Sequence, residues 1–246
     1  MIVLAIGAHP ADVFDLGGGT LANFAAQNNE VFVAVLTHGA YSHAQVVVAD
    51  KQQHALKDVV ALKKKECDEA ATHVGIKGVR YFDFDDEPFI LTREAVLALG
   101  EYVREVRPDI VITHHPQEYG HPDHPVVGEL ALRALKAAER WLEGSERDAH
   151  PMKRVYFFGT QFRGIVGRLG AQVVPADFVV NIADSIEKKK RALAAFQSQS
   201  FKGAQYEEKW VAERLTKMEG HWGIQRGLKY AEEFIALEPQ IVELLP

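Results

Sequence analysis

The feature that most constrains the fold is an apolar run at residues 1–6, followed by a glycine-rich loop, a short helix-like stretch and a second apolar run at 31–37. Short apolar runs bounded by glycine are typical of buried strands. Two such strands joined through a helix form a right-handed unit with parallel strands. The sequence therefore predicts an α/β fold with a mostly parallel sheet flanked by helices.

The rest of the chain repeats this alternation. Further strand-like runs lie at 79–82, 109–113, 155–158 and 178–181. Helix-like stretches lie at 20–27, 52–74, 92–106, 125–142, 186–197 and over much of 206–234. Irregular segments are expected at 41–51 and 161–176. A chain of 246 residues with 47% apolar content can bury one large core, so we expect a single domain over 1–246.

Two potential metal ligands lie in the loop after the first predicted strand. His9 and Asp12 stand three positions apart around Pro10, so one turn can direct an imidazole nitrogen and a carboxylate at the same ion. Open α/β sheets bind their ligands at the carboxyl ends of parallel strands. A catalytic zinc site takes three protein ligands and leaves a position for water. A third ligand must therefore come from elsewhere in the chain.

The loop at 114–124 supplies the best candidate for that third ligand. It follows the predicted strand at 109–113 and contains four histidines. If the two strands are parallel and close together, both loops face each other at the same end of the sheet. His124 then completes a set of two histidines and one aspartate, with His121 and Asp123 beside the metal.

Several other classes of function are disfavoured. The glycines at 17–19 lack the G-x-G-x-x-G spacing of a dinucleotide loop, and the second strand ends in Thr37-His38-Gly39 without an acidic residue for a ribose. A net charge of −6 argues against nucleic-acid binding. One cysteine excludes an intrachain disulfide and a thiolate-rich zinc site. No apolar run approaches a membrane span or a signal peptide, so we expect a cytoplasmic protein.

The motifs together resemble the PIG-L/LmbE-like family, which comprises zinc-dependent de-N-acetylases with a Rossmann-like fold. The first part of the resemblance is Ala8-His9-Pro10-x-Asp12 with Gly18-Gly19-Thr20-Leu21, and the second is His121-Pro122-Asp123-His124. Later stretches extend it over nearly the whole chain: Lys190-x-Ala192-Leu193, Ser198-Gln199 and Gly223-x-x-x-Gly227-x-x-Tyr230-Ala231-Glu232-x-Phe234.

The resemblance implies a role for each matching residue. It gives zinc, or another divalent transition metal, the ligands His9, Asp12 and His124. His121 matches the histidine that stabilises the oxyanion or acts as general acid, and Asp123 matches the residue that orients it. The implied substrate is a small N-acetylated molecule, and family members commonly form homo-oligomers.

One position departs from the family pattern. The first motif of the family normally reads His-Pro-Asp-Asp, and its first Asp is the general base that takes a proton from the attacking water. This chain has Ala11 there. Since general acid–base help is worth about 10²–10⁴-fold in rate, another residue must replace it in a deacetylase. The candidates are Asp15, His38, Asp86, His115 and Glu118.

Three functions therefore stay open. The first is hydrolysis of a C–N amide bond, which the complete second motif favours. The second is hydration of an unsaturated oxo-dicarboxylic acid, because a branch similar to 4-oxalomesaconate hydratase also carries Ala-Asp in its first motif. The third is a metal-binding or ligand-binding protein without catalysis, which would explain Ala11 but would leave His121 and Asp123 without a role.

Overall fold

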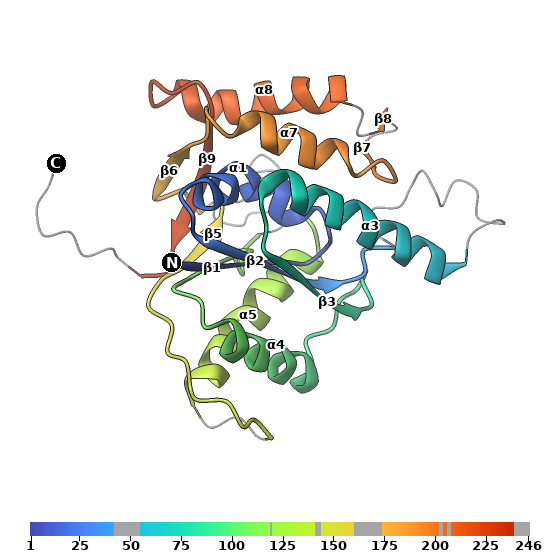
Figure 1. Cartoon of the computed structure of the whole chain (residues 1–246), viewed down its shortest axis with the longest axis vertical. Helices are drawn as coiled ribbons and strands as arrows, with labels where there is room; N and C mark the ends of the chain where they lie inside the picture. The colour runs from blue at the N-terminus through green and yellow to red at the C-terminus, as the bar shows by residue number, and fades with distance from the viewer. Residues whose placement is uncertain are drawn as a thin grey trace, which may run out of the picture.

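A seven-stranded sheet forms the centre of the computed structural model (Figure 1), and its strand order is β3-β2-β1-β4-β5-β9-β6. The first five strands are parallel, whereas β9 runs antiparallel to β5 and β6. The strands are β1 (Ile2–Gly7), β2 (Glu30–Thr37), β3 (Gly78–Phe84), β4 (Ile110–Thr113), β5 (Val155–Phe158), β6 (Phe178–Asn181) and β9 (Ala231–Ala236). The expectation of a mostly parallel α/β sheet is confirmed.

Residues 1–41, 55–118, 120–140, 144–159, 174–201, 204–205 and 208–238 are the ones that the structure describes. The irregular segments expected at 41–51 and 161–176 lie largely outside this part of the chain. Within it, two short strands, β7 (Ser200–Phe201) and β8 (Ala204–Gln205), pair with each other away from the main sheet.

Helices cover both faces of the sheet. Figure 1 shows α4 and α5 together on one face, and α1, α3 and α7 on the other, with α8 packed outside α7. Their bounds are α1 (Asp12–Ala26), α3 (Leu56–Val74), α4 (Arg93–Val106), α5 (Asp123–Glu139), α7 (Ile186–Ala194) and α8 (Glu208–Ile224). This three-layer arrangement buries the apolar strands from both sides, which is why they read as nearly continuous apolar runs.

Each face of the sheet has its own apolar core. Alternate residues of β1 point to opposite faces, so Val3 and Ala5 pack under α1 and α3, while Leu4 and Ile6 pack under α4 and α5. The single cysteine, Cys67, is fully buried in the first core, where burial raises the pKa of its thiol to about 12. Such a thiol is held protonated, which agrees with a structural role.

Helix α1 begins at Asp12, whereas the sequence predicted a loop as far as residue 19. Glycine disfavours a helix interior by about 1 kcal/mol relative to alanine, so three glycines in a row suggested a loop. Here they allow close packing: a Cβ on Gly17 would lie 2.8 Å from the ring of Phe158, and one on Gly19 would lie 2.8 Å from Ile182. The glycine run is thus a packing surface of a helix, which overrides its local preference.

Two other boundaries differ from the prediction. Helix α5 begins at Asp123, ahead of the predicted start at Pro125, and ends at Glu139. The helix-like stretch at 206–234 divides into α8 and strand β9, which inserts between β5 and β6. Its sequence, Ala-Glu-Glu-Phe-Ile-Ala, is compatible with a helix, and only the pairing of β9 with two neighbouring strands makes it a strand.

Candidate metal centre

The two predicted loops meet because β1 and β4 are neighbours. Ala5 pairs in parallel with Ile112, so the chain leaves both strands at the same edge of the sheet. From β1 the chain crosses to β2 on one side, and from β4 it crosses to β5 on the other, which makes this edge a topological switch point where open α/β sheets bind ligands. Helices α1 and α5 begin here with Asp12 and Asp123.

The carboxylate of Asp12 lies at the middle of the site. Its Oδ2 atom is 3.2 Å from His9 Nδ1, 3.2 Å from His114 Nε2 and 3.5 Å from His124 Nε2. The backbone N–H of His9 also donates to Oδ2, at 2.7 Å. All four residues are buried. The nearby imidazoles of His9 and His124 hold the pKa of Asp12 well below its usual range in spite of its burial, so the group is a carboxylate.

His9 is fixed between two carboxylates. Its Nε2 lies 3.1 Å from Asp123 Oδ2, on the side of the ring away from Asp12. Burial opposes the protonated form, but Asp12 and Asp123 outweigh it and raise the pKa of His9 to about 9. Metal-binding histidines commonly donate their second ring N–H to a carboxylate, which directs the other nitrogen at the metal. Asp123 therefore sets the tautomer in which His9 Nδ1 can bind a metal.

Two groups of side chains have ligand atoms that all lie within 4.8 Å of one another: His9 with His121 and His124, and Asp12 with His114 and His124. Each group holds two of the three predicted ligands, and Asp12 lies at a zinc-like separation from the other two. Zinc bonds of about 2.0–2.1 Å in a tetrahedron place neighbouring ligand atoms roughly 3.3 Å apart, close to the separations between Asp12 Oδ2 and the two imidazole nitrogens of His9 and His124. Both ring nitrogens of His124 are buried without a hydrogen-bond partner among the described residues, and a metal would satisfy one of them. The predicted ligands His9, Asp12 and His124 are thus brought together.

His114 lies in this cluster and was not singled out from the sequence. Its ring stacks on His124, with centroids 4.0 Å apart, and Asp12, His114 and His124 form one of two groups with metal-binding spacing. However, its Nε2 accepts a hydrogen bond from the Ala8 backbone at 3.1 Å. We therefore interpret His114 as a support for the site rather than a ligand. Its position directly after β4 is the signal that could have revealed it.

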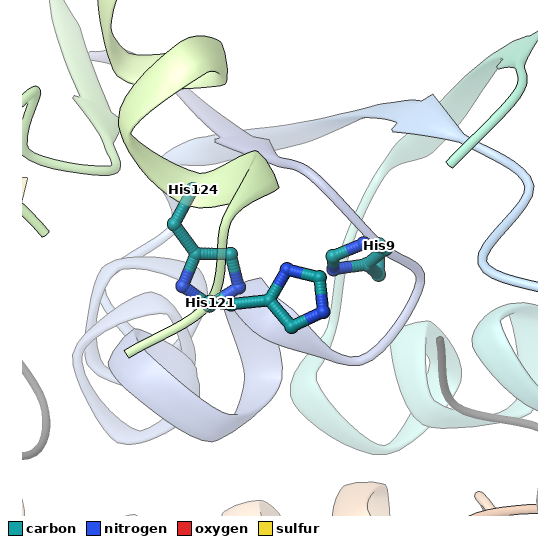
Figure 2. A group of neighbouring side chains, drawn as sticks. All are labelled: His9, His121 and His124. Carbon is teal, nitrogen blue, oxygen red and sulfur yellow. The ribbon is translucent and has the colours of Figure 1, made fainter. Parts of the chain in front are cut away.

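His121 lies at the accessible side of the cluster. Figure 2 shows its ring beside those of His9 and His124, and the centroids lie 4.5 and 5.0 Å away. Its side chain is 12% exposed, while that of His9 is fully buried. The resemblance predicted that Asp123 orients His121. The carboxylate of Asp123 contacts His9 instead, and only the backbone N–H of Asp123 reaches His121 Nδ1, at 3.2 Å.

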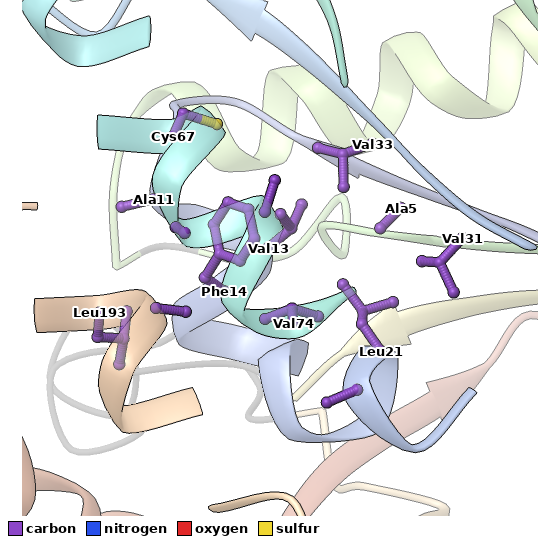
Figure 3. Close-up of a cluster of buried hydrophobic side chains, with 14 of the residues drawn as sticks. Ala5, Ala11, Val13, Phe14, Leu21, Val31, Val33, Cys67, Val74 and Leu193 are labelled. Carbon is purple, nitrogen blue, oxygen red and sulfur yellow. The ribbon is translucent and has the colours of Figure 1, made fainter. Parts of the chain in front are cut away.

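Position 11 offers no acid–base group. The Ala11 methyl group is 5% exposed and belongs to the apolar core beneath α1. Figure 3 shows Ala11 in this cluster with Cys67, Val13 and Phe14. The side chain at this position therefore neither accepts nor donates a proton.

The five predicted substitutes for the missing base have different surroundings. Asp15 forms a two-point ion pair with Arg214. His115 packs edge-on against Phe157, and its Nδ1 accepts the Gln117 backbone N–H. The buried Glu118 accepts the backbone N–H of Gly120. These three side chains have partners other than the metal ligands.

His38 and Asp86 lie closer to the centre. His38 Nδ1 is 3.0 Å from Asp86 Oδ1, and its Nε2 is 3.0 Å from Asp85. The next residue, Gly39, packs directly against His9 and Pro10. His38 and Asp86 thus form a buried pair beside the first loop, and Asp86 also accepts the backbone N–H of Tyr41.

A family model described as "PIG-L: GlcNAc-PI de-N-acetylase" matches residues 4–135, which is more than half of the chain and includes both motifs of the site. The chain belongs to the PIG-L family. The matched region includes Asp12 and the three histidines that contact it, His9, His114 and His124.

Known PIG-L relatives carry out more than one reaction. The chain is 32% identical over 164 residues to 1D-myo-inositol 2-acetamido-2-deoxy-alpha-D-glucopyranoside deacetylase 3 of Catenulispora acidiphila, a match that covers 56% of this chain and 45% of that protein. It is 27% identical over 145 residues to the 4-oxalmesaconate hydratase of Pseudomonas putida, covering 58% and 55%. The chain thus spans about half the length of these relatives.

The fold extends the likeness over nearly the whole chain. The N,N'-diacetylchitobiose deacetylase of Pyrococcus horikoshii superposes with a TM-score of 0.79 at 22% identity, covering 96% of this chain and 83% of that one. This likeness concerns the fold alone. No helix in the described ranges is both long and apolar enough to cross a membrane.

Proposed function

We propose that this PIG-L protein is a zinc-dependent hydrolase that cleaves the C–N amide bond of an N-acetylated small molecule. The observation that carries the proposal is the convergence of His9 and His124 on Asp12 Oδ2, with the accessible imidazole of His121 alongside. His9, Asp12 and His124 would hold the metal. When bound, zinc supplies a Lewis acid that polarises a carbonyl group and acidifies water.

Two further side chains, Asp123 and His121, would take part in the reaction. Asp123 holds His9 in the metal-binding tautomer. His121 has room to contact a substrate, and its Nε2–H can turn from its present acceptor, Glu87, to stabilise negative charge that develops on the carbonyl oxygen. The deacetylase relative from Catenulispora acidiphila supports an N-acetyl group as the bond to be cleaved.

A hydratase is the second candidate, and the apolar packing of Ala11 favours it. Adding water across a conjugated double bond has no amine leaving group, so it needs no acid to protonate one. The hydratase relative from Pseudomonas putida supports an unsaturated oxo-acid as the substrate in that case.

Proton NMR on pooled substrates separates the two reactions. The zinc-loaded protein is incubated with N-acetyl amino sugars and unsaturated oxo-dicarboxylates, with metal-free protein and His124→Ala as controls. We expect zinc-dependent release of acetate. Loss of vinyl signals without acetate would establish the hydratase instead. No change in either pool, from a protein that holds zinc, would favour a binding protein without catalysis.

A further inference from the structure

The carboxylate absent from position 11 has a neighbour that can replace it. Glu87 lies in the loop between β3 and α4, and its Oε1 is 3.0 Å from His121 Nε2. It was not among the substitutes expected from the sequence. We propose that Glu87 is the acid–base residue of this chain, an inference that rests on the proposed hydrolase function.

The hydrogen bonds of His121 show which of its two ring nitrogens carries the proton. The Asp123 backbone N–H donates to Nδ1 at 3.2 Å, so Nδ1 carries the lone pair. A neutral imidazole has one donor and one acceptor nitrogen, and Nε2 must therefore carry the proton and donate it to Glu87. Glu87 Oε1 is therefore the acceptor in this pair.

Accessibility distinguishes Glu87 from the other carboxylates near the site. Its side chain is 40% exposed, while those of Asp12 and Asp123 are 7% and 1% exposed. Both aspartates are also committed to His9. Glu87 can thus meet a water molecule on the side of the cluster where His121 is open, a position that the buried aspartates do not share.

The backbone holds Glu87 at this place. Its N–H donates to Asp123 Oδ2 at 3.0 Å, and the N–H of Phe89 donates to Oδ1 of the same carboxylate at 2.8 Å. Glu87 has φ of 45°, a left-handed conformation that non-glycine residues rarely adopt. Such conformations persist where surrounding contacts enforce them, and they concentrate at functional sites.

Glu87 alone can carry the proton through both steps of amide hydrolysis. As the oxygen of water forms its bond to the acyl carbon, one water proton passes to the Glu87 carboxylate. As the C–N bond breaks, the same proton passes to the leaving nitrogen. One amide and one water become one carboxylic acid and one amine, and Glu87 returns to its ionised form.

The test uses acetohydroxamate, a ligand that binds zinc through two oxygens and loses a proton as it does so. Isothermal titration calorimetry of the zinc-loaded protein, in buffers of different ionisation enthalpy, counts the protons that enter the buffer. We expect the wild type to retain the proton and Glu87→Gln to release about one, with binding weaker by about tenfold or more. Zinc content, measured by mass spectrometry, should be equal in both.

Matched variants make the outcome specific. Glu94→Gln makes the same substitution at an exposed glutamate in the first turn of α4 and should behave as wild type. On any substrate from the NMR panel, Glu87→Gln should reduce turnover by about 10²–10⁴-fold, and Glu87→Asp should retain part of it. Equal affinity and proton count in the wild type and Glu87→Gln would overturn the role of Glu87 alone. A wild type that binds neither zinc nor acetohydroxamate would overturn the proposed function itself.

Discussion

Replacing Asp123 by asparagine tests how the metal centre is organised. Asp123 Oδ2 faces His9 Nε2 and accepts the Glu87 N–H, while Oδ1 accepts the Phe89 N–H. Asparagine has one oxygen and one NH₂ group. If the asparagine oxygen takes the Oδ2 position, its NH₂ group faces the N–H of Phe89, so two hydrogen-bond donors meet. The contact with His9 also loses its negative charge. In the reverse orientation the NH₂ group faces both His9 Nε2 and the Glu87 N–H, which is less favourable still.

The expected magnitudes follow from these contacts. Loss of a carboxylate behind a metal-binding histidine typically costs 10–100-fold in metal affinity, which equals about 1.4–2.7 kcal/mol. The metal-free protein should also lose about 1–3 kcal/mol of unfolding free energy, because the buried Phe89 N–H is left without an acceptor. Asp123 is 1% exposed, so solvent does not screen these interactions.

Zinc affinity is measured by competition with a chelating dye, and stability by urea unfolding of the metal-free protein. Asp109→Asn is the matched control, because Asp109 Oδ2 also accepts a backbone N–H, that of Ile2, but at the opposite edge of the sheet. The control should bind zinc as the wild type does. If Asp123→Asn bound zinc within threefold of the wild type while folded, the argument that Asp123 sets the His9 tautomer would be refuted.

Three further predictions concern the scaffold. Lys189→Met leaves two buried glutamates without the ammonium group that lies 2.7 and 2.8 Å from them, and we expect a loss of about 3–5 kcal/mol in urea unfolding. Gly19→Ala should destabilise the protein by about 1–3 kcal/mol, because the new Cβ would clash with Ile182. Gly18→Ala should be neutral or stabilising, because its Cβ would meet nothing closer than 3.4 Å. Equal effects of the two substitutions would contradict the packing argument. Burial raises the pKa of Glu66, although hydrogen bonds from a serine oppose the shift. The fold therefore disfavours the charged form of Glu66. The wild type should gain stability relative to Glu66→Gln as the pH falls from about 7 to 4.5. A constant difference in unfolding free energy between the two proteins across that range would contradict this prediction.

Much of the fold could be predicted because its strands are short apolar runs. The pattern of β1 and β2, joined through a helix, implied a parallel sheet, and both strands occur near their predicted bounds. Local preference failed where packing overrules it. The glycines of α1 lie in a helix in spite of their low helix preference, because the absence of a Cβ lets Phe158 and Ile182 pack directly against the helix. β9 is a strand because two neighbouring strands provide its hydrogen bonds.

For the candidate site, the sequence by itself determined the chemistry at hand: imidazoles and carboxylates in two loops, each directly after a strand. Parallel strands bring such loops to one edge, so the grouping of His9, Asp12 and His124 was predictable. Only the tertiary structure decided which partner each group has. Asp123 contacts His9, His114 stacks on His124, and Glu87 reaches His121 from the loop after β3. The reason is physical: spacing along the chain fixes which loop carries a residue, whereas the partners of a side chain depend on the relative positions of separate loops, which the packing of the whole sheet sets.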